Sequence, residues 1–205
     1  GNVTITESEA SYGGCIYTRY DFTQSGGAVS LEGCRAIREG GGIFSRGNIP
    51  MEETATLTIR DSQAERGGGI MTTWIDKAWG LHVFNCSAAS HGGCVYVRDG
   101  AELAAPLSLR DCTAKGTGGG IYAEGKLVSP QISCTHCHAP TSGCLHLESG
   151  AANIESLMLR SVSRLVPVSP SIVAAGDDAV VKLGRVDCRE APGCTLAVAQ
   201  MQLAR

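Results

Sequence analysis

The sequence predicts an all-β fold, a single-stranded parallel β-helix of about eight coils, and three observations support it. A phrase of two glycines, a small residue and an aliphatic residue returns about once every 26 residues. An aliphatic-x-aliphatic pair precedes each copy of the phrase, as expected for a short strand. No stretch has the long run of helical periodicity that a helical repeat would need. A repeat of this length is typical of a solenoid in which each repeat forms one coil.

The glycine phrase predicts the corners of the coils. Its copies are Gly13-Gly14-Cys15-Ile16-Tyr17, Gly41-Gly42-Ile43-Phe44, Gly68-Gly69-Ile70-Met71, Gly92-Gly93-Cys94-Val95-Tyr96, Gly119-Gly120-Ile121-Tyr122, and the degenerate Gly143-Cys144-Leu145-His146, Ser171-Ile172-Val173 and Gly193-Cys194-Thr195-Leu196. A sharp turn between strands needs positive φ or close backbone approach, which glycine allows. A nucleotide-binding loop would need a following helix with Lys-Ser or Lys-Thr, and that context is missing.

The aliphatic pairs predict strands that stack in parallel, roughly 4.8 Å apart, around one continuous core. The pairs are Val3/Ile5, Val29/Leu31, Leu57/Ile59, Leu81/Val83, Leu107/Leu109, Ile132/Cys134, Leu157/Leu159 and Val181/Leu183. Two further columns follow each pair, one of small or apolar residues and one of alanines. The alanines are Ala10, Ala36, Ala64, Ala88, Ala114 and Ala139. A leucine-rich repeat is the main alternative, but it would need denser leucines.

Because the repeat is uninterrupted, we expect residues 1–205 to form a single β-helix domain. No polar cap is visible at either end, which predicts a fragment or processed piece of a longer solenoid, or a segment docked in a larger assembly. The chain is 43% hydrophobic with a formal charge of −3. It shows no basic patch and no apolar run of membrane-spanning length, so we expect neither nucleic acid as a partner nor a membrane span.

The chain has ten cysteines, and most occupy positions that small apolar residues fill in other coils. Stacking would bring Cys86 and Cys112 within disulfide range, although strand geometry often aims their Cβ atoms in parallel. Cys188 and Cys194 flank a short turn and form the best local pair. The cysteine density favours an oxidising compartment, and two glycosylation sequons, at Asn2 and Asn85, fit a chain that is extracellular or at the cell surface.

Residues 134–138 contain the clearest cluster of potential metal ligands in the sequence, since thiolates and imidazoles are zinc ligands. The weak candidate ligands are Cys134, His136, Cys137 and His138. The column alignment turns the cysteines inward or to a corner and the histidines the other way, whereas a tetrahedral site needs convergence. We therefore expect no metal and no other cofactor.

The residues do not fill a complete set of catalytic roles, so we expect that the chain is not an enzyme. Polygalacturonase-like enzymes share several acidic and histidine motifs on neighbouring coils, and the chain has only Asp177-Asp178 and Ser90-His91-Gly92-Gly93. A pectate-lyase-like enzyme would need acidic residues that bind calcium and an arginine that acts as the base, all projecting from one sheet. Asp61 and Asp111 instead recur beside arginines, as an outward charged stripe would.

One column carries aromatic side chains and leaves two interpretations open. Its members are Tyr17, Phe44, Met71, Tyr96 and Tyr122, continued by His146, Val173 and Leu196. By strict alternation the column points outward, where Tyr17, Phe44, Tyr96 and Tyr122 could stack on sugar rings or on a partner protein. Alternatively, a corner bends the column back into a stacked aromatic core.

The repeat resembles those of chlamydial polymorphic-membrane-protein passenger domains and other pectin-lyase-like β-helices. The resemblance rests on Gly-Gly-x-[Ile/Val] preceded by Leu-x-[Ile/Leu]-x-x-Cys-x-Ala, over most of residues 3–198. It implies a right-handed parallel β-helix at a cell surface with an adhesive or structural role. The Phe-x-x-Asn motif of that family does not occur in register; Phe84-Asn85 lacks its spacing.

These observations together predict a non-enzymatic extracellular or cell-surface scaffold that binds a partner protein or a glycan along its side. Two alternatives stay open: a polysaccharide-active enzyme or its carbohydrate-binding relative, and a structural subunit that associates end to end or docks in a larger assembly.

Overall fold

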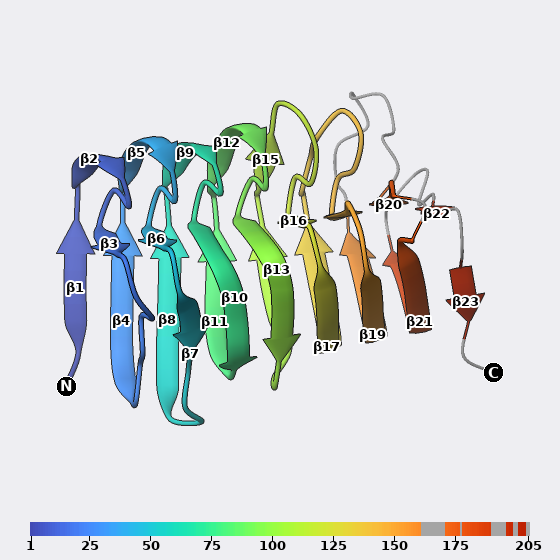
Figure 1. Ribbon diagram of the computed structural model, residues 1–205, viewed down its shortest axis with the longest axis horizontal. Coiled ribbons are helices and arrows are strands. Elements are labelled where there is room, and N and C mark those ends of the chain that lie inside the picture. Colours follow the sequence, from blue (N-terminus) through green and yellow to red (C-terminus); the bar gives the residue numbers. More distant parts are fainter. Residues whose placement is uncertain (161–170, 177, 190–195, 199–200, 204–205) are drawn as a thin grey trace.

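The computed structural model describes residues 1–160, 171–176, 178–189, 196–198 and 201–203. All elements assigned in these residues are strands, stacked in parallel as a right-handed β-helix of about seven turns. The turns follow one another along a single axis, with the two chain ends at opposite ends of the stack (Figure 1). The predicted all-β parallel β-helix is confirmed, with about seven turns where the sequence suggested about eight.

The predicted aliphatic pairs form one long face of the β-helix. Its strands are β1 (Val3–Thr6), β4 (Gly27–Glu32), β8 (Ala55–Arg60), β11 (Gly80–Phe84), β14 (Leu107–Arg110), and the last parts of β17 (Lys126–Thr135), β19 (Ala151–Arg160) and β21 (Val180–Arg189). Leu57 pairs with Val29 and Leu81, and Ile132 pairs with Leu107 and Leu157, as predicted. Leu57, Leu81, Leu107, Ile132 and Leu157 lie buried in one continuous aliphatic core, whereas Val3 in the first turn is 50% exposed.

The register predicted for the last coil is wrong. Val181 and Leu183 pair with Ala152 and Ile154, while Val186 and Cys188 lie opposite the pair Leu157/Leu159. The reason is that β19 and β21 each continue for ten residues, so each strand carries two aliphatic pairs and the sequence offers two possible alignments.

A second face follows the glycine corners. It contains β3 (Ile16–Thr18), β6 (Ile43–Ser45), the first parts of β10 (Ile70–Ala78) and β13 (Val95–Leu103), β16 (Ile121–Ala123), β18 (Leu145–Leu147), β20 (Ile172–Ala174) and β22 (Leu196–Val198). Gly40 has a φ of 65°, and a Cβ on Gly41 would lie 2.0 Å from the carbonyl oxygen of Gly68. The positive φ at Gly40 and the close backbone contact at Gly41 both exclude residues with a Cβ. The prediction that the glycines form the corners of the coils is confirmed. A third face holds β7 (Asn48–Pro50), the last parts of β10 and β13, the first parts of β17, β19 and β21, and β23 (Met201–Leu203).

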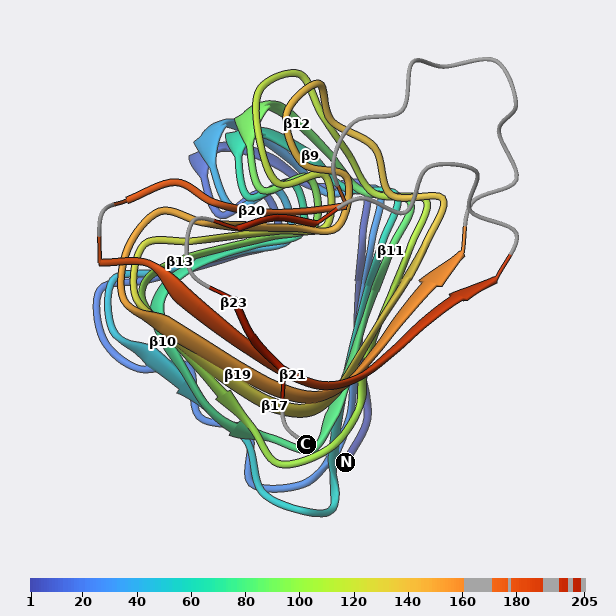
Figure 2. The ribbon, with the colours of Figure 1, turned by 90° about the vertical axis from the view of Figure 1, so that its right-hand side faces the viewer.

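A small five-stranded sheet lies outside the main tube, and the sequence did not predict it as a separate layer. Its strands are β2 (Glu9–Tyr12), β5 (Arg35–Glu39), β9 (Gln63–Arg66), β12 (Ser87–His91) and β15 (Thr113–Ala114). Viewed down the axis, it projects above the layer that contains β13 and β20 (Figure 2). The predicted alanine column runs through it in register, with Ala36, Ala64, Ala88 and Ala114 buried.

Candidate functional site

The aromatic column exists as predicted through seven turns. Tyr17 pairs with Phe44, Phe44 with Met71, and Tyr96 with both Met71 and Tyr122. His146 and Val173 extend the column. The last predicted member is wrong, because Val173 pairs with Ala197 and Leu196 pairs with Ile172. The last turn is thus shifted by one residue relative to the sequence alignment.

The column points away from the main core, yet most of it is not at the surface. Phe44, Tyr96 and Tyr122 are buried, and of the four predicted ladder residues Tyr17 alone is open, at 45% exposure. The alternation therefore holds, but the five-stranded sheet covers the column from outside. The prediction of an exposed stacking ladder is corrected at Phe44, Tyr96 and Tyr122. The rings form a separate buried cluster without a bend at the corner.

The buried rings stack on one another along the axis. Tyr17 and Phe44 lie 5.6 Å apart between ring centroids, Tyr96 and Tyr122 lie 4.8 Å apart, and Tyr122 and His146 lie 5.1 Å apart with nearly parallel planes. Offset stacking at these distances adds to the stabilisation from burial. The rings therefore form two stacks, Tyr17–Phe44 and Tyr96–Tyr122–His146, and Met71 occupies the position between them.

A second column faces the rings from the small sheet. Tyr12, Glu39, Arg66 and His91 occupy equivalent positions there. The guanidinium of Arg66 lies 5.7 Å from the Tyr96 ring centroid, and the His91 ring lies 5.0 Å from Tyr122. Burial lowers the pKa of His91 below its usual 6.5, and the charges of His146 and Arg66 lower it further.

The buried carboxylate of Glu39 joins the small sheet to the main tube. Nη2 of Arg66 contacts Oε1 of Glu39. Arg98 lies in β13, two residues after Tyr96, and its Nη2 is 3.6 Å from the same oxygen. Two guanidinium groups thus share one desolvated carboxylate, which offsets the cost of burying the charge.

Two glutamates accept hydrogen bonds from the hydroxyl groups of Tyr96 and Tyr122. The Tyr96 hydroxyl donates to Glu124 Oε1, and the Tyr122 hydroxyl donates to Glu148 Oε2 at 3.0 Å. Burial, and then these hydrogen bonds, raise the pKa of both tyrosines. His146 Nε2 lies 3.0 Å from Glu148 Oε2, and this hydrogen bond lowers the pKa of Glu148.

These pKa directions move three groups away from the range in which side chains exchange protons near pH 7. A general acid or base works best with a pKa near the operating pH. The pKa of Glu148 moves away from neutrality, as do those of Tyr96 and Tyr122. Near pH 7 the two tyrosines therefore stay protonated and Glu148 stays ionised, and the hydrogen bonds from the tyrosine hydroxyls to the glutamates hold the rings in place.

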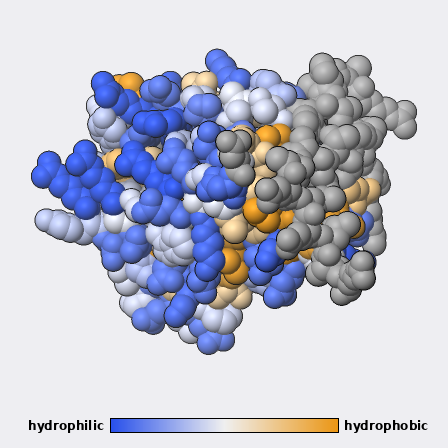
Figure 3. Space-filling view, turned by 45° about the vertical axis from the view of Figure 1, so that its right-hand side comes forward, coloured by the Kyte–Doolittle hydropathy of each residue, from blue (hydrophilic) through white to orange (hydrophobic). Residues whose placement is uncertain are grey.

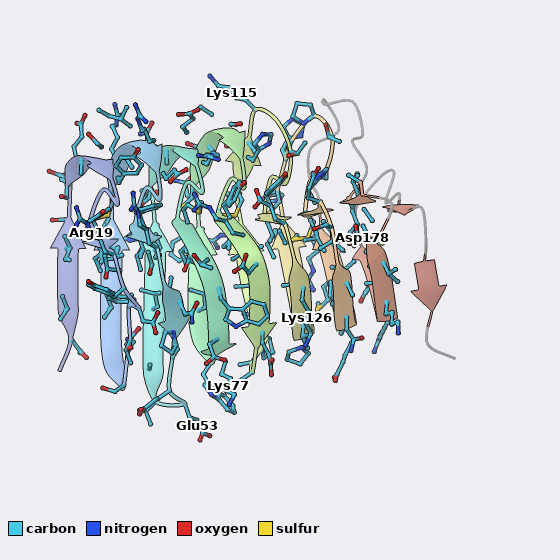
Figure 4. The ribbon with its side chains drawn as sticks, in the orientation of Figure 1. Arg19, Glu53, Lys77, Lys115, Lys126 and Asp178 are labelled. Atoms are coloured by element: carbon cyan, nitrogen blue, oxygen red, sulfur yellow. A yellow bond between two sulfur atoms is a disulfide. The ribbon has the colours of Figure 1, made fainter. Side chains whose placement is uncertain are left out.

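The structure gathers arginines that the sequence leaves far apart. The position two residues after each ladder residue forms its own column, occupied by Arg19, Arg46, Thr73, Arg98, Glu124 and Glu148. Arg19 and Arg46 are exposed, and Arg19 projects from the second face in Figure 4. The expectation of no basic patch is therefore corrected. The constant offset from the aromatic column was the signal that could have revealed it.

Three disulfides cross-link the described turns: Cys15–Cys34, Cys94–Cys112 and Cys134–Cys144, with Cα–Cα distances of 5.4, 5.4 and 5.7 Å. The predicted Cys86–Cys112 pair is wrong, because Cys112 bonds to Cys94 and Cys86 is a buried free thiol. Three disulfides indicate an oxidising, extracellular environment. Cys188 is disulfide-bonded, and its predicted partner, Cys194, lies outside the described residues.

The corner geometry explains this pairing. Cys15–Cys34 and Cys94–Cys112 each run from the residue before the aliphatic member of the glycine phrase to the small-residue column of the next turn, so the cysteines stacked within that column do not bond to each other. Cys134–Cys144 instead joins an aliphatic-pair position to the glycine corner within one turn. Opposite Cys86 the third position is Gly69, where a Cβ would lie 3.4 Å from the Cys86 sulfur. Burial raises the pKa of Cys86 to about 12, which keeps this thiol protonated.

The candidate metal ligands do not converge. Cys134 is in a disulfide, His136 Nδ1 lies 3.0 Å from Asp111 Oδ1, and Cys137 is a free thiol whose pKa burial raises to about 12. His138 pairs with Thr113 beside the small sheet. Within the described part of the chain, no group of three or more potential ligands gathers around one point.

The acidic pair considered for catalysis is incompletely described. Asp177 lies outside the described residues, and Asp178 Oδ2 accepts a hydrogen bond from the Gly150 amide at 3.2 Å. Asp178 lies toward the C-terminal end in Figure 4, away from the arginine column near Arg19.

The small sheet also carries a shallow groove of about 490 Å³. Its lining includes Gln63, Ser87, Thr113 and His138, stacked in register, with Lys115 beside them. In Figure 3 the face toward the N-terminal turns is largely hydrophilic, and apolar side chains gather beside the atoms drawn in grey.

The described residues contain no helix that could cross a membrane. Comparison with protein-family models, with curated proteins and with solved structures finds no match to this chain.

Proposed function

We propose that this chain is a non-enzymatic scaffold, extracellular or at a cell surface, which binds a partner protein or a glycan along its side. The observation that carries the proposal is an arginine- and tyrosine-rich face on a cross-linked β-helix. Arginine and tyrosine are the residues most enriched at the energetic centres of binding surfaces. The resemblance to passenger-domain repeats supports the same role.

The rigidity of the β-helix supports this proposal. Disulfides join neighbouring turns, aromatic rings stack between turns, and Glu39 links the small sheet to the tube. A surface held in one shape loses little conformational freedom when it binds, so weak contacts repeated along it become sufficient. Acid–base catalysis at Glu148 is less favoured, because its lowered pKa makes the carboxylate a weaker base.

The proposal is tested by immobilising the oxidised chain and measuring binding to soluble glycans: polygalacturonate, heparin, dextran and xylan. The same measurement uses cells coated with each glycan. The control is the reduced, alkylated chain, which we expect to unfold. Saturable binding by the oxidised chain alone is expected. Equal binding by both forms, or no binding to any glycan or cell, would refute the glycan-binding scaffold.

A further inference from the structure

The arginine column brings positive charge to one face of the first four turns. The Arg46 amide donates to the Thr18 carbonyl at 3.1 Å, which places Arg46 beside Arg19 on the next turn. The Thr73 hydroxyl then donates to the Arg46 carbonyl at 2.8 Å. Arg98 follows one turn further on. The guanidinium groups therefore recur along the axis at multiples of roughly 4.8 Å.

The small sheet adds two more arginines to this face. Arg38 Nη1 donates to the Tyr12 hydroxyl at 3.2 Å, and the Tyr12 ring lies 6.5 Å from that of Tyr17. Arg66 lies over Tyr96 and bonds to Glu39, as described above. Arg38 and Arg66 of the small sheet thus connect, through Tyr12 and Tyr96, with the ring column beside the arginine column.

Few carboxylates neutralise this charge. Glu39 is shared between Arg66 and Arg98, and Asp21 accepts a hydrogen bond from the Asn48 amide at 2.7 Å. Arg19 and Arg46 have no ion pair within the described residues. Both guanidinium groups therefore remain available in a chain whose overall charge is −3.

Exposed tyrosines lie among these arginines. Tyr17 is 45% exposed and Tyr20 is 81% exposed, and Arg19 Nε lies 3.4 Å from the Tyr17 hydroxyl. The Tyr20 carbonyl accepts hydrogen bonds from Thr18 and Ser45, so the backbone of Tyr20 is held in place. A tyrosine ring offers an apolar face with a polar edge, and a guanidinium matches a carboxylate or sulfate in a two-point contact.

We infer that this face binds an acidic polysaccharide, a linear glycan bearing carboxylate or sulfate groups, along the helix axis. This inference rests on the proposed function and names its ligand. Guanidinium groups on the first, second and fourth turns fit a linear polymer that carries anions along its length. The exposed rings fit sugar faces, which an acidic peptide would not supply. Glu124 and Glu148 reverse the charge on later turns, which confines the site to the first four.

The test compares a double variant with a matched control. Arg19→Ala with Arg46→Ala removes two exposed cations from the face, and Lys115→Ala with Lys126→Ala removes two elsewhere (Figure 4). With polygalacturonate and heparin as separate probes, we expect the arginine variant to weaken affinity at least tenfold and the lysine variant less than twofold. Thermal unfolding of both variants should match the parent chain, because all four side chains are exposed.

Tyr20→Ala separates a glycan from an acidic peptide. We expect it to weaken polygalacturonate binding severalfold and to leave any poly-glutamate binding unchanged. Equal affinity for poly-glutamate without a Tyr20 effect would assign the face to acidic peptides. Unchanged binding in the arginine variant, or equal loss in the lysine variant, would overturn the site.

Neutral probes distinguish failure of this inference from failure of the proposed function. Binding to dextran or xylan without binding to either acidic glycan would overturn the inference alone. No binding to any of the four glycans or to coated cells would overturn the inference together with the glycan-binding form of the proposed function.

Discussion

Two interiors lie back to back in this molecule, and they differ in chemistry. The main tube contains an aliphatic core, in which Leu57, Ile59 and Ile132 are fully buried. The space under the five-stranded sheet holds stacked rings bounded by Glu39 and Arg66. The strands between the two interiors bury both of their faces. One sheet layer can therefore supply apolar packing on one side and a charge-bounded ring stack on the other.

The largest expected effect is in the aliphatic interior. Leu57→Ala leaves a cavity that stacked neighbours on both sides cannot fill, and we expect it to lower the free energy of unfolding by about 2–5 kcal/mol. Chemical denaturation of the oxidised chain measures this loss. Tyr20→Ala, at an exposed site, is the control and should change stability little. Similar losses in both variants would contradict a continuous aliphatic core.

Removing a cross-link between turns should have the next largest effect. Cys94→Ser with Cys112→Ser frees a loop with a sequence separation of 18 residues, which we expect to cost about 3 kcal/mol. Denaturation measures the loss, with Cys86→Ala as the control that breaks no disulfide.

Thiol labelling checks the same disulfide pattern directly. In denaturant without reductant, alkylation should modify Cys86 and Cys137 but none of the six residues in the three disulfides. Labelling of Cys94 or Cys112 in the parent chain would show that the corner pairing is wrong.

A smaller effect is expected where the second interior meets the tube. Glu39→Gln leaves Arg66 and Arg98 without their shared carboxylate. Because both arginines are partly exposed, we expect a loss of about 1–3 kcal/mol, less than for a fully buried pair. Glu32→Gln, which breaks the more exposed pair with Arg60, should cost less than about 1 kcal/mol. Chemical denaturation measures both losses in the free energy of unfolding. Equal losses in the two variants would indicate that Glu39 does not stabilise the packing of the small sheet against the tube.

The smallest effect is a pH dependence within the second interior. Because the pKa of folded His91 lies below 6.5, the unfolded chain takes up this proton first as the pH falls. Stability is therefore full above about 6.5 and decreases as the pH falls through the folded pKa. The free energy of unfolding should be lower at pH 5.5 than at pH 7, and His91→Gln should reduce this difference. A difference of the same size in the variant would exclude His91 as its source.

Individual residues show how far the sequence could predict the fold. Val3, Val29, Leu57 and Leu81 align by spacing alone, because a strand inside a solenoid has little choice of register. The alignment failed at Val181, where a long strand offers two aliphatic pairs. Alternation correctly turned the aromatic column away from the core, but spacing alone does not predict that a separate sheet would cover it.

The candidate site was less predictable than the fold, because it depends on which residues successive turns and the small sheet bring together. Tyr17 is the one predicted ladder residue that remains well exposed, and Tyr20 and the arginine column were not singled out from the sequence. Arg19, Arg46 and Arg98 are widely spaced along the chain, so a search for a basic run misses them. They become neighbours because each turn returns the chain to the same place.

The sequence by itself determined the solenoid, its glycine corners and the aliphatic core, because these follow from a local pattern repeated once per turn. The tertiary structure decided which cysteines bond, which rings are buried and where the positive charge gathers. These outcomes depend on distances between turns and on the small sheet folding over the tube. Cys112 bonds to Cys94 across a corner and not to its stacked neighbour Cys86, because a disulfide requires converging side chains as well as close backbones.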